Sequence, residues 1–169
     1  GSLVVADPSD WFWGFIPWLR LLGETLLIAY TGTLLGAIGG FFFCFLAASN
    51  LSGKRTRWLA RRFLEFCRTV PEIVFALIFV AAVGLGPFAG VLSLAIHGAG
   101  LLGKFYADAI EEIDAGPLEA LRATGARPLQ VFVFAVLPQV IPAWIAATLY
   151  RFEVNLRAAT ILGMIGAGG

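Results

Sequence analysis

Four polar residues near the C-terminal end of the chain have the chemistry to hold an anion. They are Arg151, Glu153, Asn155 and Arg157, and they directly follow a long apolar run. On a helix, Glu153 and Arg157 would be neighbours one turn apart. Arg151 and Asn155 would form a second such pair. Guanidinium groups match the oxygens of phosphoryl-type anions in paired contacts, so Arg151 or Arg157 could bind such an anion. The alternative is a self-neutralised Glu153–Arg157 pair that stabilises the end of a helix.

A glycine-rich motif matches the fingerprints of two kinds of nucleotide site. Gly98–Gly103 has the spacing G-x-G-x-x-G, and with Lys104 it also matches G-x-x-x-x-G-K. Both sites need a strand before the glycines and a helix N-terminus after them, so that free N–H groups point at phosphate. Here the glycines end an apolar run, and Phe105 stands where a P-loop has the serine or threonine that holds magnesium. We therefore interpret these glycines as packing positions and expect no nucleotide site and no cofactor.

The remaining reactive side chains are few. One His and 2 Cys are too few for the usual zinc or iron–sulfur sites. Cys44 and Cys67 are expected to be reduced thiols. His97 is expected to be a hydrogen-bonded structural residue rather than a proton relay, since no acid lies within a helical turn of it. Pro71 and Glu72 are expected to begin a helix, with a gating role for Glu72 as the alternative. We expect neither a metal site nor an enzyme.

These residues must be held by elements that lie in a membrane. Of the 169 residues, 59% are hydrophobic and 14% are charged, against about 25% charged in a soluble domain. No lysine, arginine, aspartate or glutamate occurs in residues 25–53, 73–103 or 128–150. Each run is longer than the about 20 residues that cross a bilayer. The sequence therefore predicts an all-α, polytopic membrane protein, and a net charge of +1 gives no reason to expect a nucleic-acid partner.

The apolar runs divide into four spans and the start of a fifth. Glycines and a proline at residues 84–87 predict a tight turn inside the second run. The tryptophans between residues 11 and 18 suit a segment at the outer membrane surface, because tryptophan prefers the headgroup zone. The expected ranges are 1–23 for this interfacial segment, 24–169 for the membrane domain, and about 24–49, 70–85, 88–106, 137–152 and 158–169 for the spans.

Positive residues predict the orientation of the chain in the membrane. Residues 50–72 and 104–127 together hold nine of the 12 lysines and arginines. With two spans between them, both segments lie on one side, which the positive-inside rule identifies as cytoplasmic. We expect the segment 50–72 to be a basic loop that contacts anionic lipid headgroups.

A strip of glycines marks one face of the first expected span. Gly32, Gly36 and Gly40 recur every four residues, with Gly39 beside them. In lipid, helices associate by close backbone packing through such strips. We therefore expect a seam between two helices of the bundle or between two copies of the chain. The alternative is glycine with no special role.

The segment between the third and fourth expected spans, residues 107–137, has the pattern of an ordered loop. Gly116-Pro117 predicts a helix start, because proline suits the first helical position. Gly125 predicts its end, where a left-handed cap favours glycine. Arg127-Pro128 predicts another short helix, and Leu137-Pro138 predicts the entry to the next span. Long loops in compact proteins are usually functional or disordered, so we expect this one to pack on the bundle or on a partner.

This loop resembles the EAA loop of ABC-importer permeases. Glu119-Ala120-Leu121, then Gly125, then residues 135–138 follow the family pattern E-A-A-x3-G-x9-I-x-L-P, with Leu121 for the second alanine and Ala135 for the isoleucine. The resemblance implies a coupling helix that docks in a groove of a separate ATP-binding subunit. The residues implied to couple are Pro117, Leu118, Glu119, Ala120, Leu121, Arg122, Ala123, Thr124, Gly125, Leu137 and Pro138.

Other segments resemble the phosphonate-importer permeases in particular. They are Arg68–Glu72, Val83–Leu92, Ala123–Ala126, Leu137–Val140, Leu149–Glu153, Arg157–Thr160 and Gly163–Gly169. The resemblance runs from about Glu24 to the last residue. It implies the transmembrane helical bundle of type I, MetI-like permeases, with one further span or more beyond Gly169 and a span before Gly1.

The resemblance implies a transport subunit of the bacterial cytoplasmic (inner) membrane. It implies alternating access driven by a separate ABC ATPase subunit, a homodimer of this chain in membrane lipid, and a periplasmic or lipid-anchored phosphonate-binding protein. Arg151 or Arg157, with Glu153 and Asn155 beside them, would then face the anion's route near its external mouth. Phosphite or another small anion is the alternative cargo. A non-ABC carrier or an intramembrane enzyme is the alternative class. A carrier needs no coupling loop, and an enzyme needs a nucleophile paired with a base, whereas the spans offer only His97, Cys44 and scattered hydroxyl groups.

Overall fold

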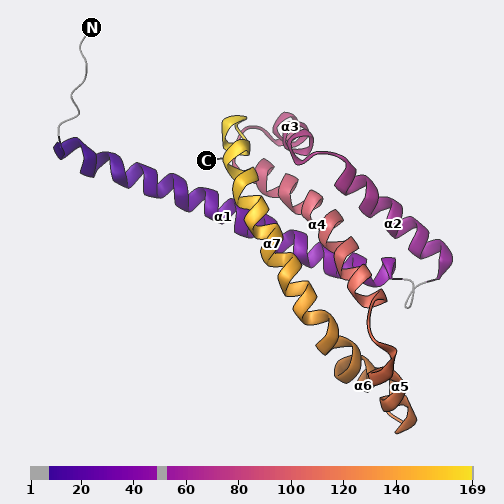
Figure 1. Cartoon of the computed structure of the whole chain (residues 1–169). Coiled ribbons are helices and arrows are strands. Elements are labelled where there is room, and N and C mark those ends of the chain that lie inside the picture. Colours follow the sequence, from indigo (N-terminus) through magenta and orange to yellow (C-terminus); the bar gives the residue numbers. More distant parts are fainter. Residues whose placement is uncertain (1–7, 49–52, 169) are drawn as a thin grey trace.

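The protein is a bundle of helices. The computed structural model describes residues 8–48 and 53–168, with side chains described from residue 15 onward. Within these ranges every regular element is a helix (Figure 1), so the predicted all-α class is confirmed. The elements are α1 (Pro8–Ala47), α2 (Lys54–Thr69), α3 (Glu72–Val83), α4 (Pro87–Glu111), α5 (Ala115–Ala123), α6 (Pro128–Val131), a π-helical turn (Phe132–Val136) and α7 (Leu137–Met164).

Three helical segments are long and apolar enough to cross a membrane. Among the described residues these are Phe15–Ala47, Pro87–Glu111 and Pro128–Met164. α2 and α3 pass the same test as a pair, although they are bent by 87° at the break between them. The predicted turn after the second span is confirmed, because α3 ends at Val83 and both Gly84 and Gly86 have positive φ angles, of 98° and 150°.

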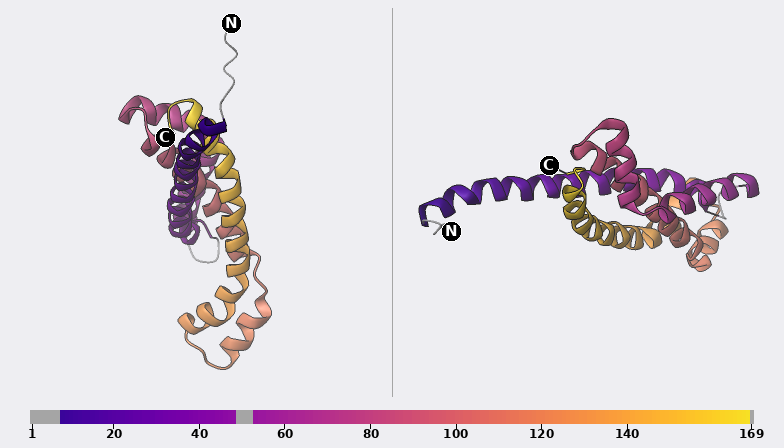
Figure 2. Two further views of the ribbon diagram at one scale, coloured as in Figure 1. Left: turned by 90° about the vertical axis from the view of Figure 1, so that its left-hand side faces the viewer. Right: turned by 90° about the horizontal axis from the view of Figure 1, so that it is seen from above.

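The bundle has one end that carries α5 and α6 (Figures 1 and 2). α1 and α4 run parallel to each other, and α2 and α7 run in the opposite direction (Figure 1). Arg61 of α2 joins three helices near this end. Its Nε donates to the Ala47 carbonyl oxygen at 3.0 Å, and its Nη2 donates to the Glu111 carboxylate at the end of α4. Both basic segments therefore start from the same end of the bundle.

Glycines of α1 bring its backbone against α4. An added Cβ at Gly32 would lie 2.7 Å from Leu94 Cβ, and one at Gly40 would lie 2.8 Å from the Gly103 backbone nitrogen. At Gly36 it would lie 3.2 Å from a carbonyl oxygen of α4. Such distances leave no room for a side chain, so the structure places all three glycines in a seam between two helices of one chain.

The glycine-rich motif lies inside α4 and packs on two sides. Gly98 faces Gly36 of α1, because a Cβ added to Gly98 would lie 3.7 Å from the Gly36 Cα. Gly100 faces α2, where an added Cβ would lie 2.7 Å from Cys67 Cβ. Because α4 begins at Pro87, these glycines are internal to a helix, and their N–H groups are not at a free helix start. The interpretation as packing positions agrees with this geometry.

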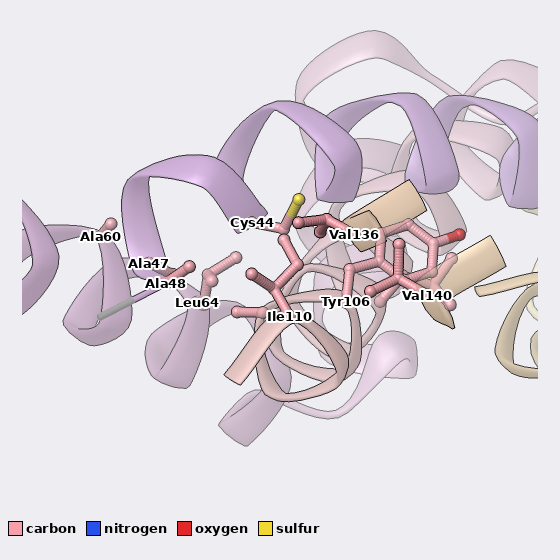
Figure 3. Close-up of a cluster of buried hydrophobic side chains, with 11 residues drawn as sticks. Cys44, Ala47, Ala48, Ala60, Leu64, Tyr106, Ile110, Val136 and Val140 are labelled. Atoms are coloured by element: carbon pink, nitrogen blue, oxygen red, sulfur yellow. The ribbon is translucent and has the colours of Figure 1, made fainter. Parts of the chain in front are cut away.

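Two apolar clusters form the core. The cluster nearer α5 brings together Cys44 of α1, Tyr106 and Ile110 of α4, Val136 of the π-helical turn and Val140 of α7 (Figure 3). The other lies towards the opposite end and contains Ile28, Ala29, Ala76, Ala89, Leu94, Ala158, Ala159, Leu162 and Ala167. Both cysteines are buried free thiols, as predicted.

The basic segment is a helix, and the prediction of a loop there is wrong. Ala60, Leu64 and Cys67 of α2 recur at helical intervals and are buried. Leu64 and Cys67 pack on the glycines of α4. The charged residues occupy the other faces of α2, which is why the segment looked like a solvated loop.

The prediction that a fifth span begins at Ala158 is also wrong, because α7 continues through Met164. Ala158, Ala159 and Leu162 are buried on the same side of this helix. The expected end of the fourth span at residue 152 therefore falls inside α7.

The loop after α4 is shorter than expected. α4 runs on to Glu111 because Tyr106, Ala107 and Ile110 remain buried in the core. The next long helical segment begins with α6 at Pro128, after the short helix α5. The connection between long helices is thus 112–127 with α5 inside it, rather than 107–137.

α1 passes the expected boundary at residue 23 without a break. Its first part extends beyond the other helices (Figures 1 and 2). Residues 1–7, and the side chains of Trp11 and Trp13, lie outside the described part of the chain. The location of the segment 1–23 at the membrane surface stays a prediction.

Candidate functional site

α5 is a short helix with a defined start and end. Asp114 precedes it, and its carboxylate accepts a hydrogen bond from the Gly116 backbone N–H at 3.1 Å, which is an N-cap. At the other end Gly125 has a φ of 79°, in the left-handed region that favours glycine. The predicted end at Gly125 is confirmed. The helix starts at Ala115, slightly before the predicted start at Pro117.

α5 rests on the bundle through Leu118 and leaves its other face open. Leu118 and Leu121 are half-buried, and Leu118 packs on the apolar cluster nearer α5. Ala120 and Ala123 project from the opposite face at helical spacing. Most of the residues that the family resemblance implies for coupling to the ATP-binding subunit are exposed. They are Pro117, Glu119, Ala120, Arg122, Ala123, Thr124 and Gly125. The structure therefore brings these residues together on one small surface.

Gln139, near the start of α7, holds the residue that caps α5. The Asp114 N–H donates to Gln139 Oε1 at 2.8 Å, and Gln139 Nε2 donates to the Asp114 carbonyl oxygen at 3.3 Å. Gln139 Nε2 also donates to the Ala135 carbonyl oxygen, at 2.8 Å. We call Asp114 and Gln139 the loop clamp, because they tie α5 to α7 by two hydrogen bonds.

Sequence reasoning missed the loop clamp. The signal available was that Gln139 is the one amide side chain between residues 131 and 150. A polar group in such a run needs hydrogen-bond partners, because an unpaired one is costly to bury. The sequence could not say that the partner would be the backbone of Asp114.

One helical segment leads from the loop into the bundle. α6, the π-helical turn and α7 together form the apolar segment Pro128–Met164. Leu137 is half-buried and Pro138 is exposed, and both directly follow the π-helical turn. Single π-helical turns are frequent at functional sites. The loop thus continues without a gap into α7.

Buried polar side chains meet in the other half of the bundle. The described residues include four buried polar or charged side chains, those of Thr33, Ser93, Arg151 and Asn155. They come from α1, α4 and α7. Ser93 and Arg151 bond to Glu72 at the start of α3, and Asn155 bonds to Thr33. We call these five residues the buried polar cluster.

Arg151 is paired with Glu72 inside the bundle. Arg151 Nη2 donates to Glu72 Oε2 at 3.0 Å, with 6% and 24% of the two side chains exposed. Ser93 Oγ donates to the Glu72 carbonyl oxygen at 3.0 Å. A lone charge at membrane depth is costly, and the carboxylate neutralises this one. Neither expectation for Glu72, cap or gate, included this pair.

Asn155 bonds to α1 and not to Arg151. Asn155 Nδ2 donates to Thr33 Oγ1 at 2.8 Å, and the Thr33 hydroxyl donates to the Ala29 carbonyl oxygen at 2.6 Å. The side-chain hydrogen bonds of Arg151 and Asn155 in the described part of the chain thus go to other helices and not to each other. Each residue instead joins α7 to a different helix.

Glu153 and Arg157 form an exposed ion pair on the outer face of α7. The side chains are 59% and 75% exposed. This agrees with the self-neutralised pair that the spacing suggests. Since α7 runs on to Met164, the pair lies within the helix and not at its end.

His97 has hydrogen-bond partners on the chain that follows α2. Its Nδ1 lies 3.2 Å from the Cys67 carbonyl oxygen and 3.1 Å from that of Val70. The prediction of a hydrogen-bonded structural histidine is confirmed. Among the described residues, no three His, Cys, Asp or Glu side chains lie together in a way that could hold a metal ion.

Comparison with protein families gives one match over most of the chain. Residues 32–169 match the family described as binding-protein-dependent transport system inner membrane component. A phosphite transport system permease protein of Stutzerimonas stutzeri, PtxC, is 46% identical over 165 residues, which are 97% of this chain and 60% of that protein. A phosphate-import permease protein of Mycolicibacterium smegmatis, PhnE, is 49% identical over 147 residues, which are 86% of this chain and 28% of that protein. The chain thus spans less than two thirds of the length of these relatives.

Solved structures share the fold. An inward-facing form of the MetNI methionine ABC transporter superposes with a TM-score of 0.78 at 22% identity, over 98% of this chain and 79% of that one. An amino acid ABC transporter superposes with a TM-score of 0.73 at 24% identity, over 92% of this chain and 76% of that one. At these identities the likeness concerns the fold alone.

Proposed function

The chain belongs to the family of binding-protein-dependent transport system inner membrane components, and from this premise we propose that it is the membrane-spanning permease subunit of an ATP-driven importer for phosphonate. It performs no covalent chemistry, and a separate ABC ATPase subunit hydrolyses the ATP. Relatives named for phosphite and phosphate support a phosphorus oxyanion as cargo. Phosphite or another small anion is the alternative within the same proposal.

The observation that carries the proposal is the exposed face of α5. A helix this short is marginal by itself, yet it is capped at both ends and held by the loop clamp. Its exposed surface includes the small residues Ala120, Ala123 and Gly125, so a partner can approach its backbone closely. We assign this surface to docking of the ATPase subunit.

Movement of the docked loop would reach the membrane through α7. The loop clamp joins α5 to Gln139, and α7 extends from there to Arg151 and Asn155 in the buried polar cluster. When ATP binding closes a pair of ATPase subunits, α5 would be displaced and α7 would move with it. Alternating access of the bundle is the expected result.

The complete importer contains further components in this proposal. A second copy of the chain completes the permease in membrane lipid, and a periplasmic or lipid-anchored receptor delivers the anion. The end of the bundle that carries α5 is cytoplasmic by the positive-inside rule.

Of the two arginines proposed for the anion's route, Arg157 is the accessible one, because Arg151 is buried against Glu72. Uptake by Arg157→Ala, with membrane abundance measured, tests its part in the route.

The test of the coupling surface is a matched pair of glycine substitutions. Gly125→Asp places a side chain on a left-handed residue of the docking surface, and Gly53→Asp places the same side chain on an exposed glycine with nothing within 4 Å and no positive φ. In the full importer, Gly125→Asp should lose co-purification of the ATPase and phosphonate uptake, whereas Gly53→Asp should keep both. If the ATPase stays bound to Gly125→Asp and still drives uptake, the assignment of α5 is wrong.

A further inference from the structure

A groove lies between α1 and α2, near the end of the bundle that carries α5. Phe43 and Leu46 of α1 form one wall, and α2 forms the other. The lining residues of α2 are Arg55, Thr56, Leu59, Ala60 and Phe63. The volume of the groove is about 530 Å³, within the range of about 300–1,000 Å³ that is usual for sites of small ligands. We propose that the groove binds one anionic phospholipid, with an acyl chain along its walls and the head group at Arg55.

The lining of the groove changes from apolar to basic along α2. The inner part consists of Phe43 and Phe63, whose rings stack with centroids 5.0 Å apart. Leu59 lies one turn nearer the start of α2, and Arg55 lies one turn beyond Leu59. Phe63 and Arg55 are therefore about 12 Å apart along the helix axis, and one leaflet of the hydrocarbon core is about 15 Å thick. A lipid of the cytoplasmic leaflet with its chain in the groove thus has its phosphate at the level of Arg55.

The cations at the start of α2 have no acidic partner within the described part of the chain. The ion pairs that α2 forms use Arg61 and Arg62. Lys54, Arg55 and Arg57, in the first turn, take part in none of the ion pairs between described residues. The residues that line the groove also include no acid. Clusters of lysine and arginine on the cytoplasmic side attract acidic lipid head groups, so the basic end of the groove selects an anionic lipid.

Trp58 places the basic end of the groove at the depth of the head groups. It is 59% exposed, and it lines a second groove together with Lys54, Arg55 and Leu59. The two grooves share Arg55 and Leu59. Tryptophan prefers the interface between membrane and water, where one edge of the ring stays wet. Arg55 therefore lies between an apolar wall and a ring that favours the membrane surface, which is where a lipid phosphate lies.

Charge and depth favour a lipid over a protein as the occupant. The same face of a second copy would bring the same cations, and like charges placed opposite each other disfavour association. A cytoplasmic subunit would not reach Phe43, which lies in the apolar segment of α1 that is long enough to cross the membrane. A lipid supplies both an acyl chain and an acidic head group. This proposal depends on the position of the chain in the membrane and not on its cargo or on the role of α5.

Retention of lipid by the complete protein, measured by native mass spectrometry in detergent, tests the proposal. Phosphatidylglycerol should stay bound, one molecule per chain, under conditions in which phosphatidylcholine with the same acyl chains is lost, because the latter has no net charge. Glycerol phosphate, an acidic head group without chains, should not displace the bound lipid. Equal retention of the two lipids, or displacement by glycerol phosphate, overturns the proposal. A groove covered by a second copy would retain neither lipid, and that result overturns it too.

A matched pair of substitutions locates the site. Arg55→Gln removes the cation at the basic end of the groove, and Arg68→Gln removes an exposed arginine at the other end of the same helix. Arg55→Gln should lower the affinity for phosphatidylglycerol by about five-fold, the contribution of one basic residue at an anionic membrane surface, whereas Arg68→Gln should leave it unchanged. Unchanged affinity in Arg55→Gln, or an equal loss in both variants, contradicts the proposed site. Both side chains are exposed, so both variants should fold.

Discussion

The loop clamp gives a prediction that can be worked from its geometry. Gln139→Leu keeps the size of the side chain and removes both hydrogen bonds between α7 and Asp114. It also removes the bond to the Ala135 carbonyl oxygen, but that bond is local to the start of α7 and does not hold α5. The substitution should therefore loosen α5 without unfolding the bundle.

The size of the effect follows from the exposure of the groups involved. A hydrogen bond contributes about 0.5–1.5 kcal/mol net. Asp114 is exposed, so water can replace the lost partners and each bond counts at the lower part of this range. Two bonds then amount to about 1–2 kcal/mol, which is a factor of about 5–30 in the equilibrium between docked and undocked α5.

Amide hydrogen exchange of residues 115–125 measures this opening directly. Exchange in Gln139→Leu should be faster than in the unsubstituted protein by about 5–30 fold, while the amides of α4 and α7 should be unchanged. Gln130→Leu is the matched control, because Gln130 makes one local hydrogen bond, from the Arg127 N–H at 2.8 Å, and does not contact Asp114.

The reasoning about the clamp fails if the two leucine variants exchange alike over residues 115–125. It also fails if exchange in Gln139→Leu increases equally over the whole bundle, since the substitution would then act on global stability. Under the proposed function, uptake and ATP hydrolysis by the full importer that carries the same variant extend the test. Looser coupling predicts fewer phosphonate molecules imported per ATP hydrolysed.

Two further outcomes follow from packing and charge. Gly40→Ala places a Cβ 2.8 Å from the backbone of α4 and should lower the free energy of unfolding by about 1–3 kcal/mol, whereas Gly23→Ala, with nothing within 4 Å, should be neutral or stabilising. Equal thermal unfolding midpoints would contradict the seam. Glu72→Gln leaves a buried guanidinium without its carboxylate and should cost about 2–3 kcal/mol, less than for a fully buried pair because 24% of the Glu72 side chain is exposed. Glu153→Gln, in an exposed pair, should cost less than about 1 kcal/mol by the same unfolding measurement, and equal losses would refute a special role for the buried pair.

Several features of the fold could be predicted because they depend on local chemistry. Uncharged runs longer than a bilayer crossing predict helices that span it, and the break before Pro87 follows from glycine and proline. The end of α5 at Gly125 follows from the left-handed conformation that glycine adopts without strain. The surface that we propose for coupling was identified differently, by its resemblance to the EAA loop of ABC-importer permeases.

Other features were wrong because local signals compete. The charges of α2 suggested a loop, although Ala60, Leu64 and Cys67 have the spacing of a buried helical face. The polar residues from Arg151 to Arg157 suggested the end of a span. They lie inside α7, since Arg151 and Asn155 find polar partners on other helices.

The sequence by itself determined the all-helical class, the long apolar helical segments, the break at residues 84–87 and the face of α1 that has no side chains. These properties reside in single residues or in neighbours one turn apart. The tertiary structure alone decided that Arg151 meets Glu72 and that Gln139 meets Asp114. Such partners are far apart in the chain, and which of them meet depends on how each helix is rotated and shifted against the next. That choice is made by the packing of the whole bundle.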